Sequence, residues 1–262
     1  MIIVKKKKLF LLLGILSFLC LLAAILFLLF YDYYPVESRV DNMREYAASD
    51  NDNYTTTGWL RVQGTNIDYP VIYAPGYDFS DKVDNFLWNE VSSDELLNQV
   101  TISGHNILNL SKNPLVTSEN HKRFEQLMSF TYLDFVKDNK YIQYTFKGHD
   151  YVYKIFSVTY TKRDDIPKFT RENLSDSDMK KYIEQSLEDS IFKFDIDVNE
   201  NDKILSLVTC TRMFGYYQDI EFKVDARLVR RGELKLNYDV APTEKYQEVK
   251  EIMEGGENNG KA

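Results

Sequence analysis

The apolar residues of this chain of 262 residues are concentrated near one end and spread in short runs elsewhere. Residues 9–30 form an unbroken apolar run without a charged residue. At about 1.5 Å per residue, a helix of this length can cross a hydrocarbon core about 30 Å thick. Four lysines, Lys5 to Lys8, precede the run, and tyrosines follow it at positions 31, 33 and 34. The arrangement predicts a transmembrane helix over 9–30, with residues 1–8 in the cytoplasm and the bulk of the chain outside.

A cleaved secretory signal also begins with basic residues followed by an apolar segment. Here the apolar segment is longer than a signal peptide needs, and no A-x-A-like cleavage site follows it. The sequence therefore favours an uncleaved anchor and a single-pass protein of the cell membrane.

Beyond the anchor, apolar and polar residues alternate in short runs, which is the pattern of half-buried β-strands. Such runs occur at residues 58–62, 64–72, 100–103, 141–146, 151–161, 204–209 and 220–229. Residues 31–55 carry Val40, Met43 and Tyr46 at helical spacing, which predicts a juxtamembrane helix and linker. We expect one mainly β domain with short helices over residues 56–238.

One clear helical pattern interrupts the strands between residues 173 and 192. Ser175 to Asp178 form a start resembling a capping box. Apolar residues then recur on one face at Met179, Tyr182, Ile183, Leu187 and Ile191. We expect this stripe to pack on the β core, since ordinary amphipathic packing explains it completely. Residues 239–262 are polar, and we expect this C-terminal tail to add little to the core.

Charge and cysteine content narrow the possible functions. The formal net charge is −8, and without the four leading lysines, which contribute +4, the rest of the chain carries −12. Such an acidic surface repels nucleic-acid phosphates, so nucleic-acid binding is disfavoured. Of the two cysteines, Cys20 lies in the apolar run and Cys210 outside it, so Cys210 has no partner for a disulfide.

Cys210 stands at the end of a β-type run, about a hundred residues after His105, which lies in a glycine-containing turn. A thiol and an imidazole brought together from two strands are what Cys/His acyl-transfer chemistry requires. A buried core thiol is the commoner fate of a lone cysteine. His121 and His149 lie in polar surroundings and are interpreted as surface or structural residues. We expect no metal site, because the spacing offers no cluster of about four ligands. We also expect no cofactor.

Two motifs here resemble those of the sortases, the membrane-anchored cysteine transpeptidases of Gram-positive bacteria. Residues 206–210, Ser-Leu-Val-Thr-Cys, resemble the T-L-x-T-C signature of that family with serine in the first place, and residues 104–106 resemble its G-H-N. The segments at 58–60 and 64–71 look like the opening strands of class B members. Phe124 and Leu127 fall where that class often has M-F-x-x-L, and the predicted helix falls where it has an inserted helix between its sixth and seventh strands.

The resemblance implies a closed eight-stranded β-barrel, a single inserted helix before the strand that bears the cysteine, and a mechanism. Cys210 would attack a carbonyl of the sorting signal of a surface protein and form a thioester, while His105 protonates the leaving amine. An incoming amine, from a pilin lysine or a cell-wall precursor, would then resolve the thioester.

The chain departs from the family at one important position. Aligned with the usual R-x-V-V-x-A-[RK] strand, residues 221–227 place Glu221 where sortases have the arginine that steadies the substrate and the oxyanion. A carboxylate reverses the sign of that charge. Either a bulge shifts the register, or another cation such as Arg212 takes the role, or the enzyme is weak or inactive. The functional alternatives are a non-catalytic, membrane-tethered assembly or binding module on this scaffold and a cysteine hydrolase.

Overall fold

The computed structural model describes residues 2–31, 37–76, 87–89, 92–106, 123–162, 173–211, 213–214, 219–233 and 237–258. By its internal contacts the chain divides into two units, one made of residues 1–35 and 231–237 and one made of residues 36–230 and 238–262. Helix α1 (Ile2–Tyr31) belongs to the first unit. Its segment Lys6–Leu26 is long and apolar enough to cross a membrane. The fold of the second unit positions the candidate site.

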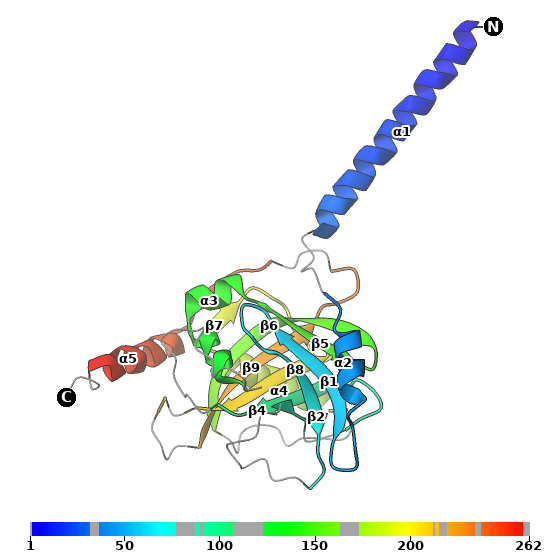
Figure 1. Ribbon diagram of the computed structural model, residues 1–262. Coiled ribbons are helices and arrows are strands. Elements are labelled where there is room, and N and C mark those ends of the chain that lie inside the picture. Colours follow the sequence, from blue (N-terminus) through cyan, green and yellow to red (C-terminus); the bar gives the residue numbers. More distant parts are fainter. Residues whose placement is uncertain are drawn as a thin grey trace. The chain divides into compact units, whose positions relative to one another are not determined.

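Eight strands of the second unit close into a barrel in the order β1-β2-β3-β4-β8-β9-β6-β5 (Figure 1). Their bounds are β1 Thr55–Val62, β2 Asp68–Tyr73, β3 Leu87–Trp88, β4 Gln99–Gly104, β5 Tyr141–Phe146, β6 His149–Lys162, β8 Ile204–Cys210 and β9 Ile220–Leu228. The expected mainly β fold with a closed eight-stranded barrel is confirmed. Six of the seven β-type runs lie almost wholly within these strands, and the run at 64–72 overlaps β2 from residue 68 onward.

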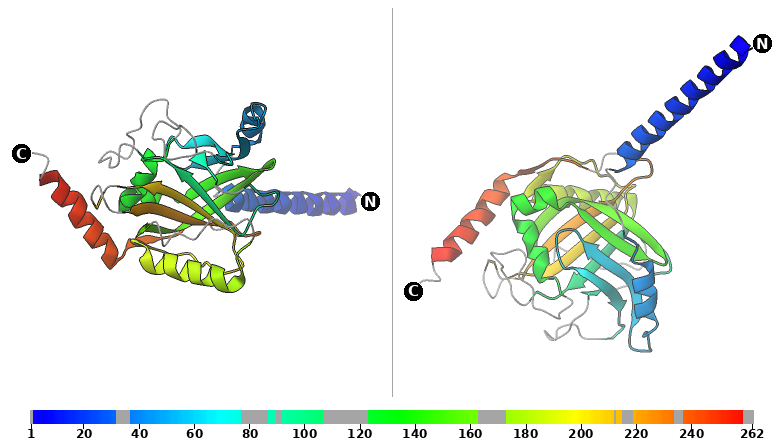
Figure 2. Two further views of the ribbon diagram at one scale, coloured as in Figure 1. Left: turned by 90° about the horizontal axis from the view of Figure 1, so that it is seen from below. Right: turned by 45° about the horizontal axis from the view of Figure 1, so that its top comes forward.

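Helix α4 (Asp176–Asp189) lies along the outside of the barrel, as the yellow-green helix in Figure 2 shows. The hydroxyl of Ser175 accepts a hydrogen bond from the backbone N–H of Asp178 at 3.2 Å, which is the expected N-cap. Met179, Tyr182 and Ile183 pack with Phe156 and Ile204. Counted along the chain, α4 lies between the sixth and seventh strands of the barrel, β6 and β8, as the resemblance implied.

One residue of the predicted apolar stripe does not lie on the buried face of α4. Leu187 is 45% exposed, whereas its neighbour Ser186 is buried. The carbonyl of Ser186 accepts a hydrogen bond from the Ser157 hydroxyl at 2.6 Å, so a polar contact turns this side of the last helical turn toward the barrel. The expectation for Leu187 was therefore wrong.

Short elements that the sequence pattern did not predict complete the unit. They are the 3₁₀ helix η1 (Glu125–Thr131), α3 (Leu133–Asp138), and the two-stranded sheet of β7 (Phe192–Phe194) and β10 (Val240–Pro242). Helix α5 (Glu244–Asn258) follows, and its Tyr246 ring lies 5.0 Å from that of Phe192. The C-terminal segment is therefore more structured than its polar composition predicted.

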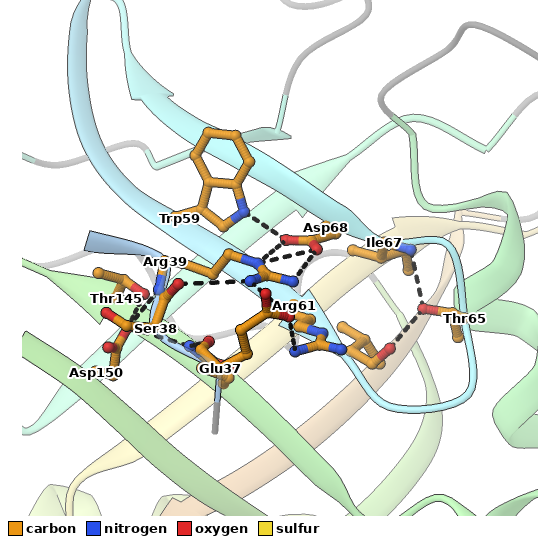
Figure 3. Close-up of polar contacts among 12 residues, drawn as sticks. Glu37, Ser38, Arg39, Trp59, Arg61, Thr65, Ile67, Asp68, Thr145 and Asp150 are labelled. Atoms are coloured by element: carbon orange, nitrogen blue, oxygen red, sulfur yellow. Dashed lines mark hydrogen bonds and ion pairs between the residues drawn. The ribbon is translucent and has the colours of Figure 1, made fainter. Parts of the chain in front are cut away.

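A polar cluster fastens the start of the second unit to the barrel (Figure 3). Arg39 precedes helix α2 (Val40–Ala47), which lies in the segment where the helical spacing of Val40, Met43 and Tyr46 predicts a helix. The Arg39 guanidinium donates to the Asp68 carboxylate from Nε and Nη2 at 2.9 and 2.8 Å. The Trp59 indole N–H donates to the same carboxylate at 2.6 Å. Asp150 accepts from the backbone N–H of Arg39 at 3.2 Å and from the Thr145 hydroxyl at 2.5 Å. The segment is thereby held by β1, β2, β5 and β6.

Candidate functional site

The register of two parallel strands brings the candidate histidine and cysteine to the same level. Each residue of β4 pairs with the residue 105 positions later in β8, from Gln99 with Ile204 to Ser103 with Val208. Continued past the end of β4, the same offset places His105 beside Cys210. Sequence analysis predicted this pair from two separate motifs, and the barrel brings the two residues together.

The third strand of the site adds an acidic residue at the same level. Strands β8 and β9 pair antiparallel from Ile204 with Arg227 to Cys210 with Glu221, and this ladder contains no bulge. Directly paired residues of neighbouring strands project to the same face of a sheet. The side chains of Cys210 and Glu221 therefore share a face, and the bulge that would have moved Glu221 out of this register is absent from the β8–β9 ladder.

That shared face is the outer one. The Tyr182 hydroxyl of α4 donates to Asp225 at 2.6 Å and lies 2.7 Å from the Ser206 hydroxyl. Because side chains alternate along a strand, Cys210 follows Ser206 on the outer face and Glu221 precedes Asp225 there. Fully buried apolar residues occupy the alternate, inner positions of β9, namely Phe222, Val224 and Ala226. Cys210 itself is exposed, so a thiol reaches solvent at the open end of the strand.

Two hydrogen bonds lock the end of β4 against the end of β8, and a third holds the backbone of His105 to Phe124. The Asn106 side-chain amide donates to the carbonyl oxygen of Cys210 at 3.0 Å, and the Thr209 hydroxyl donates to the carbonyl oxygen of Gly104 at 2.7 Å. The backbone N–H of Phe124 donates to the carbonyl oxygen of His105 at 2.8 Å. The sequence places Asn106 in the G-H-N motif, and the structure adds its contact to the backbone of Cys210.

A tryptophan covers the imidazole from the neighbouring strand. The rings of Trp88 and His105 are 5.1 Å apart and tilted by 55°. Trp88 is 9% exposed, and its ring is restrained by packing with Ile72 and Ala74. Sequence analysis missed Trp88 because β3 has two residues, too few to show an alternating pattern.

The glycine before His105 is required by space. A Cβ on Gly104 would lie 2.7 Å from Leu87 Cδ2 and 2.8 Å from Phe124 Cδ2. Two packed hydrophobic side chains would have to move to accept even alanine, and the backbone that carries His105 would move with them.

The cation that would stabilise an oxyanion is not assigned by the described part of the chain. Arg212, the predicted stand-in for the arginine of related proteins, lies outside the described residues. The next cation along β9 is Lys223, whose ammonium lies 2.8 Å from the Asp225 carboxylate and 3.0 Å from the Ser186 hydroxyl. That ammonium is therefore held toward α4 and away from the level of Cys210.

A buried polar network underlies the outer face next to the site. Lys223 and Asp225 are 6% and 0% exposed, and Lys223 Nζ lies 4.5 Å from the centre of the Tyr182 ring. Burial lowers the pKa of Lys223, but Asp225 and Tyr182, through charge and hydrogen bonding together, outweigh it and the net shift is upward. Burial, together with Asp225, raises the pKa of Tyr182. Tyr182 connects this pair to α4, since its hydroxyl donates to Asp225 and accepts from the Lys223 ammonium.

Comparisons with known proteins agree with this architecture. The family model described as Sortase domain matches residues 60–235. Sortase B of Clostridium perfringens is 26% identical over 72% of this chain and 99% of its own, with a TM-score of 0.56. Two further structures show the same fold. A Staphylococcus aureus sortase B–substrate complex is 19% identical over 72% of this chain and 85% of its own (TM-score 0.55). The sortase B from the type II pilus of Streptococcus pneumoniae is 20% identical over 66% and 92% (TM-score 0.53).

A comparison with curated protein sequences finds no significant match. The family model nevertheless spans more than half of the chain, and the barrel, the inserted helix and the structural relatives all fit class B. This chain belongs to the sortase family of cysteine transpeptidases and resembles the class B members of that family.

Proposed function

We propose that this sortase works with Cys210 as its nucleophile and His105 as its general acid and base. The observation that supports the proposal is the register of β4 and β8, whose offset of 105 residues equals the separation of His105 and Cys210 in the chain. The exposed thiol lies at a strand end where a peptide can reach it. The Asn106 contact and the Trp88 ring would hold the two groups in place.

In the first half-reaction, the Cys210 thiolate attacks the scissile carbonyl of the sorting signal and a C–S bond forms. His105, as imidazolium, gives its proton to the leaving amine while the C–N bond breaks. Since an amine is a poor leaving group without a proton, the reaction needs this donor beside the thiol.

In the second half-reaction, an uncharged amine attacks the thioester and passes one proton to His105. The C–S bond breaks, the new amide departs, and the thiolate–imidazolium pair is restored. We propose a pilin lysine or a cell-wall precursor as the source of this amine. If water takes its place, the same site is a cysteine hydrolase.

We further propose that α1 anchors the enzyme in the cell membrane, with residues 1–8 in the cytoplasm and the catalytic domain, residues 56–238, outside. The length and apolar character of α1 support this topology, as do Lys5 to Lys8 near its start, which precede the apolar residues. Residues 31–55 would then connect the anchor to the barrel, and residues 239–262 would form a C-terminal extension outside the catalytic domain.

A second candidate is a non-catalytic assembly module on the same scaffold. The acidic Glu221 opposite Cys210 favours it, because a carboxylate does not stabilise an oxyanion. In the catalytic account Arg212 supplies the missing cation, and Arg212→Ala should lower turnover at least about tenfold, equivalent to about 1.4 kcal/mol of transition-state stabilisation. Unchanged turnover would remove Arg212 from the mechanism.

The test is a product assay on the full chain in detergent, with a panel of sorting-signal peptides and amine acceptors. We expect a ligated product that is lost in both Cys210→Ala and His105→Ala. Cys20→Ala is the matched control, since it removes the other cysteine, and should keep the activity. Product from Cys210→Ala would exclude the proposed nucleophile. If the hydrolysed peptide is the sole product whichever amine is added, the result would favour the hydrolase.

A further inference from the structure

The end of β9 places a negative charge at the point where the acyl group would be held. Glu221 is the direct cross-strand partner of Cys210. Paired residues of antiparallel strands have Cα atoms about 4.5–5.5 Å apart and side chains on one face. A glutamate side chain next to the thiol can therefore place its carboxylate within a few ångströms of a thioester on Cys210.

Two neighbours of Glu221 on the sheet are an uncharged residue and a lysine whose ammonium contacts another carboxylate. On the other side of β9, Glu221 is paired with the neutral Thr161 of β6. Lys223, two residues along the same face, directs its ammonium to Asp225 at 2.8 Å. Glu221 is half-buried at the same open end of the sheet at which Cys210 is exposed. A carboxylate has two oxygens and about four acceptor positions, so it can bind an incoming donor beside a contact it already makes.

A carboxylate beside Cys210 interacts favourably with only one of the two substrates, the acyl acceptor. It repels a thiolate and an oxyanion, and it attracts a cation. The acyl acceptor is an amine, and both a lysine side chain, with an ordinary pKa of about 10.4, and a chain terminus, with one of about 7.7–8.0, arrive largely as ammonium at neutral pH. The arginine that related sequences carry here would repel such an acceptor.

We propose that Glu221 is the binding residue for the ammonium group of the acceptor amine. The inference rests on the proposed function and deepens it, because it assigns the second substrate to a particular side chain. The ammonium binds to the carboxylate beside the thioester and loses one proton to solvent. The neutral nitrogen then forms the C–N bond, gives its second proton to His105, and the C–S bond to Cys210 breaks.

The experiment separates the two half-reactions in the full chain in detergent. Acyl-enzyme formation is followed with the peptide of the sorting-signal panel that loads Cys210. Its resolution is then measured with Nα-acetyl-lysine amide and triglycine, which are cationic at the amine, and with hydroxylamine, which is largely uncharged at neutral pH. In Glu221→Gln we expect the KM for both cationic acceptors to rise about tenfold, equivalent to about 1.4 kcal/mol. The rate with hydroxylamine should be unchanged.

Three variants sharpen the result. Glu188→Gln removes one negative charge from the exposed side of α4 and should leave both KM values unchanged. Glu221→Asp keeps the charge and should recover part of the affinity. Glu221→Arg should use cationic acceptors still less well than Glu221→Gln does, while forming the acyl-enzyme at least as fast as the wild type.

The outcomes also distinguish this proposal from the proposed function. If the wild type forms no acyl-enzyme with any peptide, the transpeptidase account itself fails and with it the inference. If the acyl-enzyme forms normally and Glu221→Gln leaves the KM for lysine amide and triglycine unchanged, only the role of Glu221 is overturned. An equal loss with hydroxylamine would assign Glu221 a structural effect and would also overturn its role in ammonium binding.

Discussion

Asn106 is hydrogen-bonded to the backbone of Cys210, from its side-chain amide to the carbonyl oxygen at 3.0 Å. The bond joins the segment that carries His105 to the strand end that carries the thiol. Since proton transfer between two groups depends on their separation to a fraction of an ångström, such a tie can matter to the rate far more than to stability.

We predict that Asn106→Ala lowers the rate of acyl-enzyme formation about tenfold or more, while the free energy of unfolding falls by only about 0.5–1.5 kcal/mol. The measurement combines a single-turnover assay with urea unfolding. Asn201→Ala, which alters an exposed asparagine in a turn, is the control and should change neither. A wild-type rate in Asn106→Ala would show that the tie has no part in positioning the pair.

Trp88 should act on His105 through ring packing. Trp88→Ala leaves a space beside the imidazole, and we expect acyl-enzyme formation to slow about tenfold or more, because an unconstrained ring samples unproductive orientations. Trp88→Phe keeps an aromatic ring beside the histidine and should retain most of the rate. Equal rates for the phenylalanine and alanine variants would argue against a role for the ring.

The free energy of unfolding should fall far more when one partner of the Lys223–Asp225 pair is replaced than when both are replaced. Asp225→Asn leaves the Lys223 ammonium buried without its counter-charge, and we expect a loss of about 3–5 kcal/mol in the free energy of unfolding. Combining it with Lys223→Met should restore part of that loss. A double-mutant cycle by urea unfolding measures the coupling, and simple additivity of the two changes would contradict an ion pair.

The Arg39–Asp68 contact should stabilise the start of the barrel unit. Asp68→Asn weakens a two-point bond from Arg39 and the bond from the Trp59 indole, so we expect a loss of about 2–3 kcal/mol. Trp59 is one of only two tryptophans, so its fluorescence in a Trp88→Phe background follows this cluster directly. Asp134→Asn, at an exposed carboxylate of α3, should change the stability by much less.

Asp150 should make part of the stability depend on pH. Burial alone raises the pKa of Asp150, but hydrogen bonds from Ser38, Thr145, the Arg39 backbone and Gln143 together lower it below its ordinary value of 3.8. Because the folded pKa is the lower one, the contribution is complete above the ordinary value and is lost as the pH falls through the folded value. The difference in unfolding free energy between wild type and Asp150→Asn should therefore shrink between about pH 6 and about pH 3. A constant difference would contradict the assigned shift.

The main strands could be predicted because alternation is a local property. The runs at 141–146 and 204–209 read directly as β5 and β8, and Ser175 marked the start of α4. The two-residue β3 and the three-residue β7 and β10 could not be found, since their pairing comes from distant segments and is too short to leave a period. Every residue of η1 is buried, the polar Glu125 and Gln126 included, so its polar and apolar positions do not mark an exposed and a buried side.

The candidate pair could be predicted because each member belongs to a recognisable motif. Trp88 and the Asn106 contact could not, because what matters there is which strands become neighbours, and closure of the barrel decides that. The alternation of Glu221, Lys223, Asp225 and Arg227 on β9 is visible in the sequence, but it looks like a solvent-exposed face. The packing of α4 shows that Lys223 and Asp225 are buried, and the β8–β9 register shows that Glu221 is paired with Cys210.

The most direct test of the account is the mass of the full chain after incubation with the sorting-signal peptides in the absence of an amine, followed by digestion to locate any adduct. We predict an acyl adduct on the peptide that contains Cys210, absent from Cys210→Ala, present in Cys20→Ala, and converted to a ligated product when an amine is added. An adduct on any other residue, or ligation that persists in Cys210→Ala, would contradict the account.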